Sequence, residues 1–316
     1  MKPIEILTQA LELVAALAAA PLFLGWVNQC RAWLQNRRAP SIWLPYRGIR
    51  KLFYKDAVIA ENASPLFRVA PYIVFGAMVV AAGIIPSMGT RLPFTIAADA
   101  IALVGLLATA RVFLSLAAMD IGTAFGTLGA RREMMVGFLA EPALLMVIFV
   151  ASIISATTAL PAIAENLATQ TLGLYPSLAF TAVAFTLILL AENARIPIDN
   201  PATHLELTMI HEAMVLEYSA RHLALMECAA SLKLFNYACI GFALFLPWGI
   251  STGAGGPLSL AASIPLLAAK LTVTGAALAF IETISAKLRV FRAPEFLAIA
   301  FMLAVLGLLV HLLLGA

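Results

Sequence analysis

The sequence predicts an all-α, polytopic membrane protein with about eight transmembrane helices. Hydrophobic residues make up 62% of the chain and charged residues only 12%, whereas soluble domains are about half apolar and about a quarter charged. Long apolar stretches recur along the chain, and a bilayer span needs about 20 mostly apolar residues. Backbone groups in lipid must bond within their own segment, so spans of this length are expected to be helices.

The predicted spans follow one another so closely that no separate soluble domain fits between them. They are Ile4–Val27, Val69–Met88, Ile96–Ala118, Gly137–Thr158, Leu172–Ala191, Leu232–Gly249, Leu258–Ile281 and Phe296–Leu314. Residues 1–316 are therefore predicted to form a single integral membrane domain. Glu5 and Glu12 interrupt the first apolar run, which favours a retained span over a cleaved signal peptide.

The positive charge is concentrated in alternate loops. The net charge of +3 is small, but the odd-numbered loops hold most of the basic residues. These are Arg31, Arg37, Arg38, Arg47, Arg50, Lys51, Lys55, Arg68, Arg131, Arg132, Arg195, Arg221, Lys287, Arg289 and Arg292. Loops on the other side carry only Lys2 and Arg91. The positive-inside rule places the odd-numbered loops in the cytoplasm and both termini on the non-cytoplasmic side.

The first cytoplasmic loop contains a candidate surface helix, Leu44–Asp56. Its apolar residues alternate with basic ones in a pattern typical of an amphipathic helix at the membrane surface. Aromatic residues lie among them, including Trp43 and Tyr46, and such rings favour the membrane interface. The alternative is an ordinary juxtamembrane loop.

The loop between the fifth and sixth spans is acidic, although the other loops predicted on the same side of the membrane are basic. It holds Glu192, Asp199, Glu206, Glu212 and Glu217, with Arg195 among them. The Asn-Pro pair at residues 200–201 suits a helix N-cap and first turn. On a helix starting there, Glu206 and Glu217 would share a face.

Ionisable residues also fall at membrane depth, where each costs roughly 2.5–3.5 kcal/mol. They are Glu12, Asp99, Arg111, Glu141, Lys270 and Glu282. Burial beside like charges raises the pKa of a carboxyl toward neutrality, which suits a proton relay. The predicted relay residues are Glu141, Glu192, Asp199, Glu206, Glu212 and Glu217. The alternative is that these carboxylates pair with Arg111, Arg132 or Arg195 and only hold helices together.

The sequence gives little support for catalysis by this chain alone. Its three cysteines have neither zinc nor iron–sulfur spacing, and the histidines of the acidic loop are weak evidence for a metal. No nucleophile–base motif is present. We therefore expect no catalytic residue, metal or cofactor on this chain itself.

Several segments together resemble the complex I subunit 1 family. They are Arg37-Arg38-Ala39-Pro40 with Pro45 and residues 51–56, Gly129–Glu133 with Glu141, and Glu192–Asp199 with Glu206-Leu207 and Glu217–Ser219. Within that family the chain is most similar to the hydrogenase branch, the membrane subunits of hydrogenase-4 and formate hydrogenlyase. Arg111, residues 120–126 and the Gly-Ala-Arg-Arg-Glu run carry this similarity.

The resemblance implies a non-catalytic membrane anchor of an oxidoreductase complex in a prokaryotic plasma membrane, coupled to proton translocation. Expected partners are hydrogenase-like large and small subunits, an iron–sulfur subunit and antiporter-like membrane subunits. The [NiFe] centre and iron–sulfur clusters would be theirs. Docking or structural charge partners on this chain would be Arg37, Arg38, Lys51, Arg111, Arg131, Arg132 and Arg195.

Two functions other than the hydrogenase anchor are compatible with the sequence. One is the quinone-site subunit of a complex I-like dehydrogenase. Ala202 and His204 stand where quinone-using members of the family have glutamates, which weakens the expectation of a bound quinone without removing it. The other is a stand-alone transporter, which the absence of a visible inverted repeat disfavours.

Overall fold

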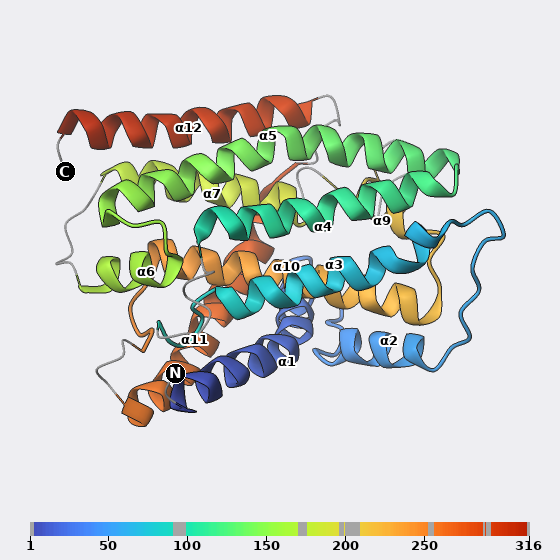
Figure 1. Ribbon diagram of the computed structural model, residues 1–316, viewed down its shortest axis with the longest axis horizontal. Coiled ribbons are helices and arrows are strands. Elements are labelled where there is room, and N and C mark those ends of the chain that lie inside the picture. Colours follow the sequence, from blue (N-terminus) through green and yellow to red (C-terminus); the bar gives the residue numbers. More distant parts are fainter. Residues whose placement is uncertain are drawn as a thin grey trace.

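The computed structural model in Figure 1 describes residues 3–90, 99–169, 176–195, 199, 209–251, 256–286, 288 and 292–314. Within these ranges the chain is helical and has no β-strand. The helices are α1 Pro3–Leu34, α2 Leu44–Phe53, α3 Pro65–Ile84, α4 Ala100–Asp120, α5 Ala124–Ser155, α6 Leu160–Thr169, α7 Pro176–Glu192, α9 His211–Val215, α10 Ala220–Phe245, α11 Gly256–Ile284 and α12 Ala293–Leu314.

The helices confirm a multi-pass membrane protein. Among the described residues, helices α1, α3, α4, α5, α10, α11 and α12 are long and apolar enough to cross a membrane. Helix α7 is apolar but has only 17 residues, so the count of eight spans stays a prediction. The two termini lie toward the same end of the bundle (Figure 1). Which side of the membrane that end faces also stays a prediction.

The opposite end carries α2, the turn between α4 and α5, and α9 (Figure 1); we call it the basic end. Helix α10 runs inward from it through the centre of the bundle and packs against α1, α2, α3, α6, α7 and α11. Its apolar window is 72% buried, against 22% for α12. A helix buried all round belongs to the protein interior, whereas the exposed apolar face of α12 suits lipid or another membrane subunit.

Helices α1, α5 and α10 extend well beyond the predicted spans. Helix α5 begins at Ala124 rather than Gly137, so Arg131 and Arg132 lie on a helix and not in a loop. Helix α10 begins at Ala220 rather than Leu232, and α1 continues to Leu34. Hydropathy detects only the part of a helix that lies in lipid, and a helix as long as α5 spans about 48 Å against a hydrocarbon core of about 30 Å.

A helix is present within the predicted segment Leu44–Asp56: it is α2, which ends at Phe53. Its place at the membrane surface stays a prediction. None of its residues is buried, and Pro45 lies in its first turn. The Tyr46 hydroxyl donates a hydrogen bond to the carbonyl of Ala18 in α1, and the Trp43 and Tyr46 rings lie 5.7 Å apart. The tyrosine therefore ties the helix to α1, and the helix also packs against α10, while its basic side chains stay exposed.

The acidic loop does not form the continuous helix expected after Asn200. Residues 200–208, which include Glu206, lie outside the described residues. Beyond them Met209 and Ile210 are not helical, and α9 covers only His211–Val215. Oδ2 of Asp199 accepts hydrogen bonds from the backbone nitrogens of Ile210 and His211, both at 3.2 Å. The chain thus folds back on Asp199, which a helical pattern could not anticipate.

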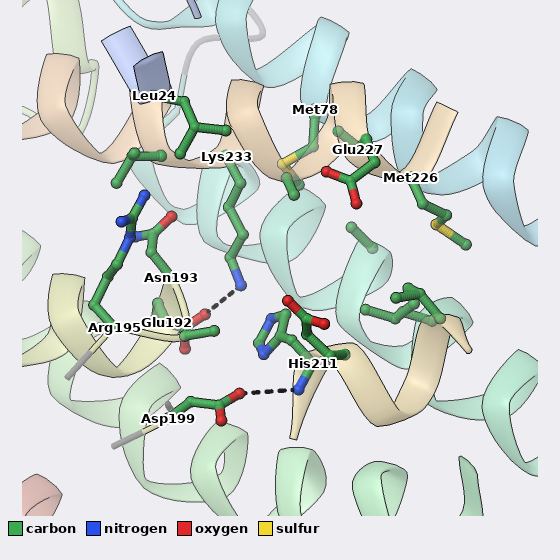
Figure 2. A pocket seen from close by; sticks show the side chains of 18 of the residues that line it. Leu24, Met78, Glu192, Asn193, Arg195, Asp199, His211, Met226, Glu227 and Lys233 are labelled. Carbon is green, nitrogen blue, oxygen red and sulfur yellow. Dashed lines mark hydrogen bonds and ion pairs between the residues drawn. The ribbon is translucent and has the colours of Figure 1, made fainter. Parts of the chain in front are cut away.

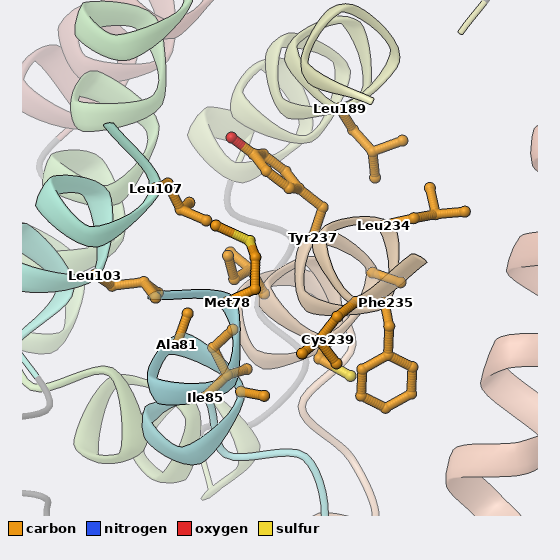
Figure 3. Close-up of a cluster of buried hydrophobic side chains, with 14 of the residues drawn as sticks. Met78, Ala81, Ile85, Leu103, Leu107, Leu189, Leu234, Phe235, Tyr237 and Cys239 are labelled. Atoms are coloured by element: carbon orange, nitrogen blue, oxygen red, sulfur yellow. The ribbon is translucent and has the colours of Figure 1, made fainter. Parts of the chain in front are cut away.

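An apolar core fixes the helices that carry the charged residues described below. Figure 3 shows Met78 of α3 and Leu107 of α4 packed beside Tyr237 of α10. Tyr237 is fully buried and Leu107 is 3% exposed. Leu107 lies one turn before Arg111, so this packing sets where Arg111 enters the space between α4, α5 and α7.

Candidate functional site

Arg111 is buried in the middle of α4 and binds three carboxylates. Its Nη1 lies 2.6 Å from Oε1 of Glu141 and its Nε 3.4 Å from Oε1 of Glu133, both on α5. Its Nη2 pairs with Oε1 of Glu192 at the end of α7. A guanidinium can do this because its N–H donors point in several fixed directions in one plane.

The face of α5 that receives Arg111 is built by residues four apart. Glu133, Gly137 and Glu141 lie one turn apart on the same side of the helix. A Cβ atom at Gly137 would overlap Nη1 of Arg111 and lie 2.8 Å from its Cδ. The guanidinium therefore lies across Gly137, between two glutamates that bind it from either side.

This close approach predicts that Gly137→Ala displaces Arg111. Overpacking a filled interior typically costs about 1–3 kcal/mol, and here it also weakens ion pairs, so we expect a lower melting temperature of the purified protein. Gly105→Ala is the matched control, because an added Cβ on that helical glycine meets no atom within 4 Å. Equal melting temperatures for the two variants would contradict this arrangement.

Two further basic residues lie against these carboxylates. Nζ of Lys233, on α10, lies 3.0 Å from Oε2 of Glu192. Nδ1 of His211, on α9, lies 3.5 Å from Oε2 of Glu133. We call Arg111, Glu133, Glu141, Glu192 and Lys233 the Arg111 cluster. With three carboxylates and two permanent cations, it has room for one more positive charge.

A second buried ion-pair group lies nearby, around Glu282 of α11. Oε1 of Glu282 is 3.2 Å from Nη1 of Arg195, and Oε2 is 3.5 Å from Nη1 of Arg31. The Glu282 side chain is fully buried. Burial lowers the pKa of Arg195, and the Glu282 carboxylate acts in the opposite direction. This group joins α1, α11 and the segment that follows α7.

The two ion-pair groups border one cavity of about 400 Å³. Figure 2 shows its polar side, with the Lys233–Glu192 ion pair and the hydrogen bond from His211 to Asp199. The cavity is also lined by Glu212 and Glu227, both of which are exposed residues. They mark an acidic mouth between α9 and α10.

The other side of the cavity is apolar. Its lining includes Leu24 of α1, Met78 of α3, Leu114 of α4 and Leu234 of α10. Cavities of this volume, with an apolar wall and a few polar groups, are typical of small-molecule sites. The cavity can equally hold several waters, since one water needs about 10–15 Å³ of such space.

The predicted relay residues have different surroundings. Glu192, Asp199 and Glu212 line the cavity, and Glu141 joins them through Arg111. Glu217 is exposed in the turn after α9 and is not among the lining residues. Ion pairing of buried carboxylates with Arg111 is therefore present, as the alternative expected, and a relay role stays a prediction.

The predicted charge partners also separate into two groups. Arg111 and Arg195 form buried ion pairs, and Nη1 of Arg132 donates to the carbonyl of Met209 at 3.1 Å. The remaining ones are exposed: Arg37, Arg38, Lys51 and Arg131. No group of three or more His, Cys, Asp or Glu side chains within the described ranges is placed to hold a metal ion.

Sequence reasoning missed Glu133 and Lys233 as members of the cluster. In the sequence, Glu133 stands out only as part of the Gly-Ala-Arg-Arg-Glu run. The repeat of glutamate, glycine and glutamate at four-residue spacing could have placed it beside Glu141. Lys233 interrupts an apolar stretch of α10, and a lysine in such a position usually has a partner.

The chain is similar to known proteins over nearly its whole length. A family model described as NADH dehydrogenase matches residues 7–313. Hydrogenase-4 component C of Escherichia coli (strain K12) is 36% identical over 239 residues, which cover 75% of this chain and 74% of that protein. Formate hydrogenlyase subunit 4 of the same organism is 31% identical over 296 residues, 92% of this chain and 94% of that protein.

The fold is also found in a solved structure. A chain of the membrane-bound sulfane sulfur reductase, an archaeal respiratory membrane complex, superimposes with a TM-score of 0.79. The match covers 95% of this chain and 98% of that one, at 19% identity, and so shows a shared fold. From the family match and the two curated relatives, this chain belongs to the NADH dehydrogenase family of complex I subunit 1-like membrane proteins.

Proposed function

We propose that this chain is the membrane anchor and proton-coupling subunit of a respiratory, hydrogenase-like complex in a prokaryotic plasma membrane. The observation that carries the proposal is the buried Arg111 cluster beside a cavity with an acidic mouth. The similarity to subunits of hydrogenase-4 and formate hydrogenlyase supports a hydrogenase-like assembly. The chain itself carries out no redox step in this proposal.

The basic end would receive the soluble redox arm. Its exposed arginines and lysines, among them Arg37, Arg38, Lys51 and Arg131, can pair with acidic surfaces and orient them. The arm would consist of hydrogenase-like large and small subunits with an iron–sulfur subunit, which hold the [NiFe] centre and the iron–sulfur clusters. Antiporter-like membrane subunits would lie alongside in the bilayer.

Charge balance gives the Arg111 cluster a reason to take up a proton. Its three carboxylates exceed its two cations by one negative charge, and an uncompensated charge at membrane depth is costly. A proton that enters past Glu212 can bind His211 or a carboxylate of the cluster. A change of charge in the redox arm would then alter how strongly that proton is held.

Glu141 is the member of the cluster that faces outward. Its side chain is 35% exposed, whereas those of Glu133 and Glu192 are 3% and 2% exposed. A carboxylate on the outer side of a membrane helix needs a polar neighbour. In our proposal an adjacent membrane subunit supplies it and accepts the proton from Glu141.

Purification of the tagged chain from native membranes in mild detergent tests this function. Co-eluting subunits are identified by mass, and the sample is assayed for viologen-linked hydrogen activity and for quinone reduction. We expect a hydrogenase-like pair of subunits and hydrogen activity. A chain that elutes alone would contradict the proposal and would reopen the transporter hypothesis.

The apolar wall of the cavity favours a second candidate, the quinone-site subunit of a complex I-like dehydrogenase. Leu24, Met78 and Leu234 could contact a quinone ring while Lys233 and His211 bind its oxygens. Quinone reduction without hydrogen activity in the purified complex would support this candidate. A quinone analogue that protects α2 from surface labelling would add that the quinone enters beside this helix.

A further inference from the structure

Glu12 is a buried acid at the other end of the molecule from the basic end. It lies on α1 and is fully buried. Its Oε1 accepts hydrogen bonds from the backbone nitrogens of Met88 at 2.9 Å and Gly89 at 2.6 Å, just beyond the end of α3. Its Oε2 is buried and has no hydrogen-bond partner in the part of the chain that the structure describes. This end of α3 points away from α2 and α9 (Figure 1).

Among the described residues, Glu12 differs from the other buried glutamates in having no cation paired with it. Glu192 pairs with Arg111 and Lys233, and Glu282 pairs with two arginines. None of the ion pairs formed within the described ranges includes Glu12. A buried carboxylate without a cation is costly enough that such a group takes up a proton instead. In a neutral acid, Oε1 is the carbonyl oxygen that accepts both N–H groups and Oε2 carries the proton.

Titratable side chains from three other helices lie in this part of the bundle. Cys239 of α10 is an electrostatic neighbour of both Glu12 and Lys270. Nζ of Lys270, on α11, is engaged with the carbonyl of Leu246 at 2.6 Å. Glu165 of α6 accepts a hydrogen bond from Thr90, next to Gly89, at 3.3 Å. None of these side chains therefore supplies a direct counter-charge to Glu12.

Helix α10 connects this acid to the Arg111 cluster. Lys233 and Cys239 are six residues apart, about 9 Å along the helix. Between them lie Asn236 and Tyr237, both fully buried. Oδ1 of Asn236 has no hydrogen-bond partner among the described residues, although buried polar atoms are usually satisfied. The Tyr237 hydroxyl lies close to the Glu192 carboxylate. Asn236 and Tyr237 both lie on α10 between Lys233, which pairs with Glu192, and Cys239, which interacts with Glu12, and so provide polar positions in an otherwise apolar core.

We propose that Glu12 is a protonated carboxylic acid and the second proton-binding site of this subunit, in the half of the membrane away from the basic end. It would exchange protons with the Arg111 cluster along α10 and with the solvent at the turn formed by residues 88–90. Its part in coupling rests on the proposed function above, whereas its protonated state does not.

Infrared spectroscopy tests the protonated state directly. Glu12→Gln keeps an oxygen that can accept from Met88 and Gly89 but cannot bind the exchangeable proton. The difference spectrum between wild-type and variant complexes at neutral pH isolates this single group. We expect the variant to lose a band in the carbonyl stretching region of a protonated carboxyl. Loss of intensity only in the carboxylate region would show an ionised Glu12 and overturn the proposal.

Proton translocation tests the role in coupling. The complex is reconstituted in liposomes, and protons moved per electron transferred are measured. We expect Glu12→Gln to lower this ratio at least tenfold. Gln9→Met is the control for loosening of the same region, because it removes the hydrogen bond from Gln9 to Gly83 without removing a titratable group, and it should keep the ratio.

The outcomes separate this inference from the proposed function. If the wild-type complex pumps and Glu12→Gln pumps equally well, Glu12 is not a coupling site and the proposed function stands. If the wild-type complex shows electron transfer without proton movement, the proton-coupling role itself fails. The infrared result then still decides the state of Glu12.

Discussion

Replacing Arg111 with Met is expected to prevent the chain from accumulating as a stable folded protein. The variant leaves Glu133, Glu141 and Glu192 close together with Lys233 as their remaining permanent cation. Removing one partner of a buried ion pair typically costs about 3–5 kcal/mol, which is a large part of the total stability of most domains. The measurement is the yield and melting temperature of the detergent-solubilised protein after size-exclusion chromatography.

Two comparisons make this result specific to the buried ion pairs. Arg131→Met removes an exposed arginine at the start of α5 and should change the melting temperature little, because exposed charges contribute about 0–1 kcal/mol. Arg111→Met combined with Glu192→Gln should recover part of the loss, since it removes one unpaired carboxylate. If Arg111→Met is as stable as Arg131→Met, the three carboxylates do not depend on Arg111.

A lysine at position 111 would not replace the arginine. Its single ammonium can meet one or two carboxylates, whereas the guanidinium reaches Glu133, Glu141 and Glu192 from three different nitrogens. Because Gly137 has no side chain, the flat guanidinium of Arg111 can lie directly against the backbone of α5 at this position. Arg111→Lys should therefore lie between wild type and Arg111→Met in melting temperature.

Much of the fold could be predicted because the bilayer imposes simple rules. Hydropathy placed the apolar part of the long helices, and the amphipathic pattern of α2 was sufficient to identify it. The short helix α6, Leu160–Thr169, was not predicted. Helix lengths were less accessible, because α5 and α10 continue out of the apolar region through polar turns. The backbone path at Asp199 and the short helix α9 depend on tertiary hydrogen bonds that leave no periodic pattern.

The sequence identifies several residues of the site but not which of them are paired. A charge inside an apolar span is conspicuous, so Arg111, Glu141 and Glu282 could be identified as unusual. Their partners could not be assigned, since the sequence does not say which faces of α4, α5 and α7 meet. Glu282 was expected at membrane depth, and it binds Arg31 and Arg195. Arg31 and Glu282 are 251 positions apart in the chain. Only packing reveals such a contact.

Replacing Glu141 with Gln should leave the complex assembled but stop proton translocation. The amide oxygen of Gln can still accept from Nη1 of Arg111, and Glu141 is the most exposed acid of the cluster, so we expect a loss of stability of about 1 kcal/mol or less. Gln cannot bind and release the proton, so a route through this position is blocked. We expect the protons moved per electron to fall at least tenfold.

The matched control is Glu61→Gln, an exposed acid in the segment between α2 and α3, which should pump like the wild type. Both variants are compared after subunit composition has been verified by mass, so that loss of a partner is not mistaken for loss of coupling. Unchanged pumping by an intact Glu141→Gln complex would remove Glu141 from the route. Its contact with Arg111 would then be a structural ion pair, and the cavity would have to pass protons through Glu133 or Glu192 instead.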